Sequence, residues 1–273
     1  MQYWSMTEGV FNCLIDTERT KAFKKAIQNT VKKGDVVVDM GTGSGVLAML
    51  AADSGASMVY AVEIDKKNVA TLKDTFATNG YSEVITILEG DATTISLPEK
   101  IDVIISEMVA TGLIEELQVQ AMNNMLRFGK ENVRVLLNKM EQYIDLVYNN
   151  NSYYGHTFNI VRYEYPDINQ LTSVAHTNAE LYSVVDFSKP IRDTMVKVTK
   201  RLFIDKDGTI NSLRISNKTI FFDGSTLGAT FAYCFPVILP ISEQIVKAGE
   251  IFTVSLSYTL CGGFDTLAYS VYQ

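Results

Sequence analysis

Two patterns of hydrophobic residues alternate along the first half of the chain. Continuous apolar runs, typical of strands buried on both faces, occur at 36–39, 58–62, 84–88 and 102–107. Predicted helices lie before and between them, at 20–32, 44–54 and 66–79. Strands separated by helices of about ten residues indicate right-handed crossovers, so this half is predicted to form an α/β unit with a parallel sheet.

The pattern changes after about Tyr148, where an asparagine-rich stretch leads into short β-like runs. Apolar and polar residues alternate strictly at 195–200 and 252–258, and 205–208 and 223–224 are turn signals between such runs. This alternation predicts antiparallel strands with one buried face. The fold class is therefore predicted as α/β plus β, with a Rossmann-like domain followed by an all-β domain.

A glycine-rich turn joins the first predicted strand to the helix after it. The run 38–45, Val-Asp-Met-Gly-Thr-Gly-Ser-Gly, has the spacing G-x-G-x-G, and the next strand ends at Glu63. Glycines at such a junction let the backbone approach a ligand and leave helix N–H groups free, and a carboxylate at Glu63 suits a ribose diol. The order of strand, glycines, helix, strand and acid predicts a cofactor site. A tight turn without a ligand is the alternative.

Four polar or glycine positions follow the ends of predicted strands: Gly41, Glu63, Asp91 and Glu107. The carboxyl ends of parallel strands share one edge of the sheet, and ligands bind there in open α/β folds. The sequence therefore predicts that these four positions surround one ligand site.

Composition narrows the class of protein. The 273 residues carry a net charge of −7, which disfavours nucleic acid and would attract a cationic substrate, although ordinary acidic solubility is the simpler explanation. Cys13, Cys234 and Cys261 lack metal-ligand spacing and are odd in number, so neither a metal site nor a disulfide framework is expected. No export signal and no apolar run of about 18 residues is found, so a cytoplasmic protein without membrane contact is predicted.

Several segments, in order along the chain, resemble the protein arginine methyltransferases, within the class I S-adenosylmethionine-dependent methyltransferases. The matching segments are 16–20, 38–45 with 49–52, 59–63, 106–108 with Glu116, and 234–240, 246–250 and 262–265. The resemblance covers most of the chain. It implies N-terminal lid helices at 1–30, a Rossmann-like domain that binds S-adenosyl-L-methionine at 31–148, and a β-barrel-like substrate domain at 149–273.

The resemblance also implies which residues bind S-adenosyl-L-methionine. Arg19 would pair with its carboxylate in a bidentate geometry, and a solvated surface charge is the alternative. Glu63 would bind the ribose hydroxyls. The other implied contacts are Asp39 and Gly41 at the methionine portion, Gly43 and Gly45 in the glycine turn, and Asp91, Ala92 and Thr93 at the adenine edge, where a plain turn is the alternative.

Glu107 and Glu116 resemble the double-glutamate loop of this family, and the resemblance makes them the catalytic residues. A guanidinium presents five N–H donors in a rigid fork. Two carboxylates can hold that fork and leave one nitrogen aimed at the sulfonium methyl. Two solvated acids are the alternative, and Glu115 is the nearest competitor to Glu116.

Four residues are predicted to shape the substrate pocket: Trp4, Cys13, Val109 and Phe231. Cys13 and Val109 stand where asymmetric-dimethylating relatives carry methionines. The segment 230–232 lacks the histidine of the Thr-His-Trp loop found in many relatives, so the type of methylated product stays open. Trp4 is either a pocket wall or a core residue.

The predicted function is S-adenosylmethionine-dependent N-methylation of a guanidino group, in free arginine, in a peptide or protein, or in a small natural product. The alternatives are N- or O-methylation of another small molecule, and a non-catalytic scaffold that keeps the fold. A homodimer is a further expectation from the resemblance. Its dimerisation arm, between 153 and 177, would be reduced because the segment is short and contains Tyr165-Pro166-Asp167.

Overall fold

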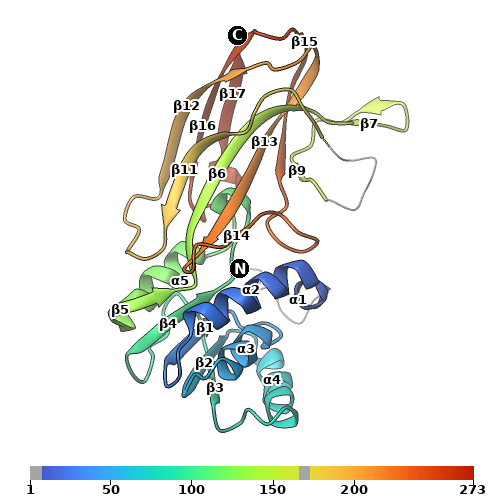
Figure 1. Cartoon of the computed structure of the whole chain (residues 1–273). Helices are drawn as coiled ribbons and strands as arrows, with labels where there is room; N and C mark the ends of the chain where they lie inside the picture. The colour runs from blue at the N-terminus through green and yellow to red at the C-terminus, as the bar shows by residue number, and fades with distance from the viewer. Residues whose placement is uncertain (1–7, 166–172) are drawn as a thin grey trace.

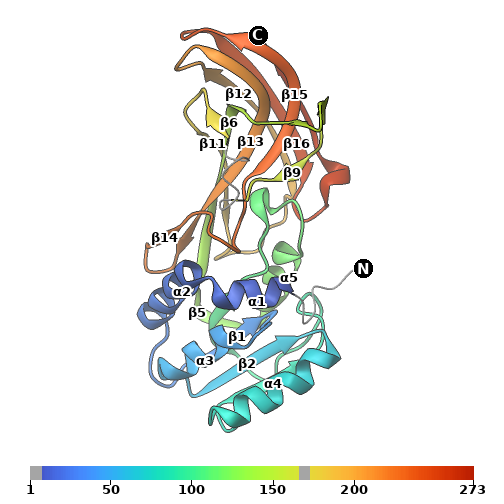
Figure 2. The ribbon, with the colours of Figure 1, turned by 90° about the vertical axis from the view of Figure 1, so that its right-hand side faces the viewer.

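The computed structural model describes residues 8–165 and 173–273, which form two stacked parts (Figure 1). The lower part in this view holds a parallel sheet with its helices, and the upper part holds long antiparallel strands. Helices α1 (Glu8–Ile15) and α2 (Thr17–Thr30) lie at the junction of the two parts, as the view turned by 90° also shows (Figure 2).

Four strands of the parallel sheet form where the apolar runs predict them, and the fifth, at 129–135, is not predicted. Its strands are β1 (Val36–Met40), β2 (Met58–Glu63), β3 (Ile85–Glu89), β4 (Ile101–Ser106) and β5 (Gly129–Val135), in the order β3-β2-β1-β4-β5. Every residue of β1 is buried, which explains its unbroken apolar run. The strand order reverses between β1 and β4, so the loops that follow these two strands leave a crevice at their carboxyl ends.

The three predicted helices form, with ends displaced by up to three residues, whereas the helix at 118–125 is not predicted and no helix joins β3 to β4 across the described residues 90–100. The connecting helices are α3 (Val46–Asp53), α4 (Lys66–Thr78) and α5 (Gln118–Met125), with short 3₁₀ turns η1 (Thr111–Leu113) and η2 (Leu126–Phe128). Asp16 is the N-cap of α2, because its side chain accepts a hydrogen bond from the backbone N–H of Arg19 at 3.0 Å. None of the helices described is long and apolar enough to cross a membrane.

The upper part consists of antiparallel strands, as the alternation predicts. The long strands of one sheet are β6 (Leu137–Tyr148), β11 (Glu180–Asp186), β13 (Gly208–Phe221) and β15 (Val237–Val246); β12 (Met195–Phe203), β16 (Ile251–Thr259) and β17 (Ala268–Tyr272) form another. The short elements are β7 (Ser152–Tyr153), β8 (His156–Thr157), β9 (Arg162–Tyr163), β10 (Val174–Ala175), β14 (Thr226–Leu227) and η3 (Phe264–Thr266). In β16 the buried residues Phe252, Val254, Leu256 and Tyr258 alternate with more exposed ones.

Strand β6 pairs with β13 in the antiparallel sheet, although it precedes the predicted division at residue 149. Four consecutive residues near its end, 144–147, are buried, so its sequence resembles that of the parallel strands more than that of a half-exposed strand. The switch from continuous to alternating apolar residues in the sequence therefore comes later than the switch from the parallel to the antiparallel sheet. The domain boundaries themselves stay a prediction.

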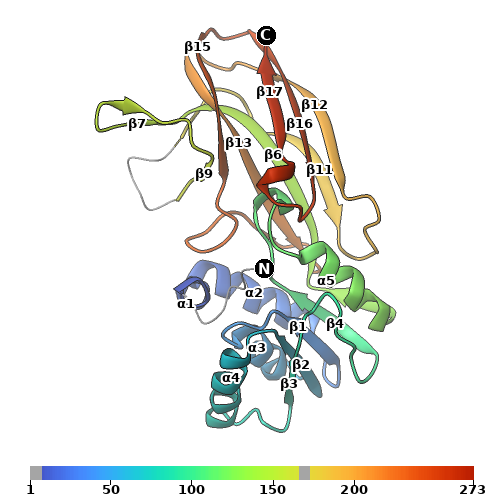
Figure 3. The same cartoon turned by 180° about the vertical axis from the view of Figure 1, so that it is seen from behind.

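An aromatic cluster fixes α2 against the upper part. Phe23 on α2 packs edge-on against Phe221 and Tyr233, with ring centroids 5.0 and 5.9 Å apart, and all three side chains are buried. At the far end of the helix, Asn29 donates a hydrogen bond to Asp223 at 2.8 Å. Seen from behind, α2 again lies between the parallel sheet and the upper strands (Figure 3). The helix that carries Arg19 is therefore held by both halves of the chain.

Two glycines with the same backbone conformation differ in their surroundings, which gives a matched test of the glycine turn. Gly45 and Gly80 both have φ of +79°, but a Cβ at Gly45 would lie 2.6 Å from the ring of Phe76, whereas one at Gly80 meets nothing within 4 Å. Gly80→Ala is expected to cost about 1–2 kcal/mol from the left-handed backbone alone. Gly45→Ala is expected to cost about 1–3 kcal/mol more, from overpacking. Urea unfolding of both variants measures the difference; equal costs would show that α4 moves aside without penalty.

Candidate active site

The glycine turn after β1 has the open backbone that its sequence predicts. Gly41, Gly43 and Gly45 have φ of +64°, +54° and +79°, in the left-handed region that favours glycine. A Cβ at Gly41 would lie 3.0 Å from the side chain of Met108, which follows β4, so the turn and the β4 loop approach closely. The side chains of Met108, Val10 and Phe76 therefore lie against the three glycines of the turn.

Asp39 lies buried under this turn. Its carboxylate accepts a hydrogen bond from the Thr42 hydroxyl at 2.7 Å. Burial raises the pKa of Asp39 to about 7, and the Thr42 hydrogen bond and the charge of Arg19 oppose the rise. The predicted position of Asp39 at the cofactor crevice is in keeping with this geometry.

Glu63, at the end of β2, is fixed beside the turn. One carboxylate oxygen accepts hydrogen bonds from the backbone N–H groups of Ile64 and Asp65, at 2.9 and 3.0 Å. The other accepts from the Asn68 side chain at 2.9 Å and, over a longer 3.3 Å, from the Gly43 N–H. The predicted ribose-binding acid is thus held in one orientation, with its weakest hydrogen bond on the side of the glycine turn.

The predicted adenine-binding residues form an ordered turn after β3. One oxygen of Asp91 accepts hydrogen bonds from the N–H and hydroxyl of Thr93, at 2.8 and 2.7 Å. The carbonyl of the buried Ala92 accepts a hydrogen bond from Asn124 on α5 at 3.0 Å. The Gly90 N–H donates to the Glu63 carbonyl at 2.8 Å, which ties this turn to the end of β2. Asp91 and Glu63 therefore border the same edge of the sheet.

Arg19 reaches from α2 to the end of β4, where it forms an ion pair with Glu107. Its second terminal nitrogen donates to the Cys13 carbonyl at 3.1 Å, and its guanidinium lies 5.1 Å from the centre of the Phe23 ring. The Arg19 side chain is only 4% exposed. Its Nε is buried and has no hydrogen-bond partner among the residues described. A buried donor without a partner is costly, so this N–H is available to an incoming acceptor.

The two predicted catalytic carboxylates interact. Glu107 follows β4, and Glu116 lies on the loop before α5 with φ of +58°. Burial raises the pKa of Glu116 to about 8, helped by the negative charges of Glu107 and Glu115. Burial also raises the pKa of Glu107, against the opposing effect of Arg19. Two carboxylates that repel each other in a shielded site are suited to a cation.

Glu115 has a different partner from its neighbour. Its carboxylate accepts a hydrogen bond from the hydroxyl of Tyr163 on β9. The sequence offers both acids as candidates, and their surroundings differ: Glu115 bonds to the upper part, while burial and then the charge of Glu107 raise the pKa of Glu116. The sequence alone carries no signal for the Tyr163 contact.

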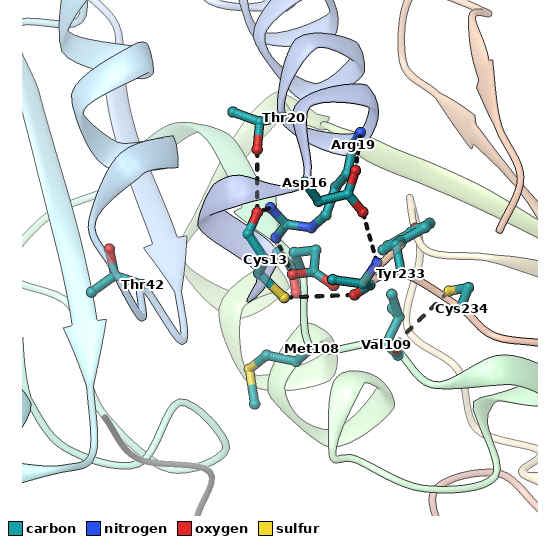
Figure 4. A network of polar contacts seen from close by, with 12 residues as sticks. Cys13, Asp16, Arg19, Thr20, Thr42, Met108, Val109, Tyr233 and Cys234 are labelled. Carbon is teal, nitrogen blue, oxygen red and sulfur yellow. Dashed lines mark hydrogen bonds and ion pairs between the residues drawn. The ribbon is translucent and has the colours of Figure 1, made fainter. Parts of the chain in front are cut away.

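Sequence reasoning missed Asp16, which connects α2 to the loop 230–234. One of its oxygens caps α2. The other accepts hydrogen bonds from the Thr230 hydroxyl at 2.5 Å and the Ala232 N–H at 2.8 Å. Figure 4 shows Asp16 and Arg19 between α2 and this loop. The spacing predicts this helix from residue 20, whereas α2 begins at Thr17, so the N-cap role of Asp16 is evident only from the structure.

The predicted pocket residues have different locations. Cys13 approaches the loop 230–234, with its sulfur 3.6 Å from the Ala232 carbonyl oxygen, and the sulfur of Cys234 lies 3.9 Å from the carbonyl oxygen of the buried Val109 (Figure 4). Phe231 belongs to the same loop, but its side chain is 45% exposed. Trp4 lies outside the described residues. The pocket roles stay predictions.

The candidate site fits S-adenosylmethionine. The Nε–H of Arg19 is buried without a partner among the residues described, the glycine turn has a left-handed backbone, and Glu63 ends the second strand. Among the residues described, no three metal-ligating side chains come together.

A parallel sheet with a glycine turn at its switch point and an acid after the second strand is the arrangement of cofactor-binding doubly wound folds. The matching family model and the relatives identify this chain as an S-adenosylmethionine-dependent methyltransferase. S-adenosylmethionine is accordingly the cofactor. The chain belongs to the family described as ribosomal protein L11 methyltransferase (PrmA), whose sequence model matches residues 17–154.

Relatives extend the likeness over both parts. The uncharacterized protein MJ1452 of Methanocaldococcus jannaschii is 33% identical over 261 residues, 94% of each chain. The arginine N(omega)-methyltransferase of Streptomyces achromogenes subsp. streptozoticus is 36% identical over 110 residues, which are 39% of this chain and 30% of that protein. The Trypanosoma brucei PRMT1 enzyme-prozyme heterotetrameric complex with AdoHcy shares the fold, with a TM-score of 0.78 over 96% of each chain at 19% identity.

Replacement of Asp16 tests whether its contacts with the loop 230–234 stabilise the fold. Asp16→Ala is expected to lower the free energy of unfolding by about 2–3 kcal/mol, because it removes an N-cap and leaves two further donors unpaired. Asp65→Ala is the matched control, since Asp65 caps α4 through one bond to the Lys67 N–H. It is expected to cost about 1 kcal/mol. Urea unfolding measures both, and an equal loss in the two variants would contradict a role beyond capping.

Proposed function

We propose that this enzyme transfers a methyl group from S-adenosylmethionine to a nitrogen of a guanidino group. The proposal depends chiefly on one observation, the interacting pair Glu107 and Glu116 beside Arg19 at the end of β4. Two shielded carboxylates match the donors of a guanidinium, and the resemblance in the sequence points to the same two residues. The net charge of −7 further favours a cationic acceptor.

The cofactor would be bound by residues of both the sheet edge and α2. S-adenosylmethionine supplies a methyl group on a positively charged sulfur. Arg19 would donate its free Nε–H to the cofactor carboxylate while it keeps the ion pair with Glu107. Glu63 would accept from the ribose hydroxyls, and Asp91 with Thr93 would border the adenine. The glycines 41, 43 and 45 would admit the ligand against the backbone.

The two glutamates would have different roles in the reaction. Arg19 stabilises the ionised form of Glu107, so Glu107 suits the task of orienting the guanidinium. Glu116, with a pKa raised to about 8, is the better proton acceptor. Removing a proton from a free guanidinium at pH 7 would cost about 7 kcal/mol, so the proton leaves during or after transfer. Positioning of the acceptor nitrogen supplies much of the rate enhancement.

The proposed methyl acceptor is a molecule that carries a guanidino group. Free arginine, an arginine-containing peptide or protein, and a guanidino natural product all carry the group that the two glutamates would hold.

The three unpaired cysteines support a cytoplasmic location. A homodimer is proposed because α1 exposes Phe11, Leu14 and Ile15, and the β7–β8 hairpin exposes Tyr154.

A panel of acceptors tests the function. Purified protein is incubated with labelled S-adenosylmethionine and with arginine, agmatine or arginine-containing peptides, and products are located by fragmentation in a mass spectrometer. A methyl group on a guanidine nitrogen is the expected result. Glu107→Gln should lower the rate by about 10²–10⁴-fold with little loss of cofactor binding.

Glu89→Gln is the matched control for this variant. Glu89 ends strand β3, which β2 and β1 separate from β4, and among the residues described it forms an exposed ion pair with Lys66, at 3.5 Å. The rate of this variant should therefore be unchanged. Cofactor binding without methylation of any guanidine would exclude the guanidine assignment and leave another amine or a hydroxyl as acceptor.

The raised pKa of Glu116 predicts a pH dependence. A carboxyl group with a pKa of about 8 is mostly neutral at pH 7 and ionises as the pH rises, so kcat/KM for the guanidine should increase through about pH 8. The same step should lie at lower pH in kcat, because a bound cation favours the ionised form. Glu116→Gln should abolish the step. A profile without a step near pH 8 in the native enzyme would contradict the raised pKa of Glu116.

A further inference from the structure

The loop that carries Glu116 has an unfavourable backbone. Between β4 and α5, Gly112, Leu113 and Glu116 have φ of +68°, +51° and +58°. For the two residues that are not glycine, this conformation costs about 1–2 kcal/mol each. Such a loop keeps its shape only when its surroundings hold it there.

The upper part of the molecule holds the first half of this loop. The Tyr258 hydroxyl donates to the Gly112 carbonyl at 2.8 Å. The backbone N–H groups of Cys261 and Gly263 donate to the carbonyls of Leu113 and Ile114, at 2.6 and 2.8 Å. These bonds end before the two glutamates, so another contact must fix the direction of the residues that follow.

That contact is the hydrogen bond from Tyr163 to Glu115. The Tyr163 hydroxyl is itself held firmly, because its backbone pairs with Val237 of β15. Its ring packs edge-on against Phe235 and Phe264, with centroids 6.3 Å away in both cases. A rigid donor on the upper part therefore holds the residue directly before Glu116.

We propose that Tyr163 is a positioning residue that orients Glu116 by binding the neighbouring Glu115. The hydrogen bond holds Glu115 against β9, and the next residue, Glu116, lies near enough to Glu107 for the two charges to interact. The same bond keeps Glu115 from competing for the guanidinium. The inference depends on the proposed function, and it assigns to a residue of the upper part the alignment of a catalytic group on the lower part.

The first test compares two tyrosine variants in the full-length enzyme. Tyr163→Phe removes only the hydroxyl, and it should lower kcat for the guanidine by about 10–100-fold, because a misplaced catalytic group slows transfer. The affinity for S-adenosylmethionine, measured by calorimetry, should stay within about twofold. Tyr269→Phe is the matched control, since the Tyr269 hydroxyl donates to the Pro240 carbonyl at 2.8 Å elsewhere in the upper part. It should leave kcat unchanged.

Variants of Glu115 separate positioning from a loss of folding. Glu115→Gln keeps an oxygen that accepts from Tyr163, so kcat at high pH should be retained. It also removes a charge that raises the pKa of Glu116, so the step in the pH profile should move to lower pH. Glu115→Leu should lose activity as Tyr163→Phe does, and the double variant Tyr163→Phe/Glu115→Leu should lose no more than either single one.

Each outcome separates this inference from the proposed function. A native enzyme that methylates no guanidine would refute the proposed function. An active native enzyme whose Tyr163→Phe variant keeps full kcat, or losses that add in the double variant, would overturn the positioning role alone. If Tyr163→Phe does not fold, equal kcat values for Glu115→Gln and Glu115→Leu would overturn it as well.

Discussion

The ion pair between Arg19 and Glu107 is the interaction on which the site depends. It joins α2 to the end of β4, and both side chains are largely withdrawn from water, with 4% and 15% of their surfaces exposed. Removing one partner of a buried pair costs about 3–5 kcal/mol, because the remaining charge has no compensation. The pair therefore ties α2 to the end of β4 and favours the ionised form of Glu107 against the effect of burial, while one buried N–H of Arg19 has no partner among the residues described.

The rest of the site is arranged around this pair by contacts between the two parts. Asp16 connects the start of α2 to the loop 230–234, and Phe23 on the same helix packs against Phe221 and Tyr233. Helix α2 is thus a shared element rather than an appendage of the parallel sheet. Its position determines both where a cofactor carboxylate would bind and how Glu107 is presented.

The fold around the glycine turn could be predicted because its signals are local. The glycine spacing, Asp39 and Glu63 fall within one strand–helix–strand unit, and the apolar runs placed the strands within two residues. The contacts of Asp16 and Glu115 could not be predicted, because they join residues separated by 214 and 48 positions along the chain. The sequence also gives no direction for a loop side chain, so the exposure of Phe231 emerged only from the fold.

The left-handed loop before α5 has a consequence for the order in which the enzyme matures. Its carbonyls bond to Tyr258, Cys261 and Gly263, close to the end of the chain, although the loop itself belongs to the first half. During synthesis the parallel sheet can fold from contacts that are short in sequence, whereas this loop must wait for the last strands. A nascent chain would therefore complete its parallel sheet before the loop that carries Glu116 is held in its left-handed shape.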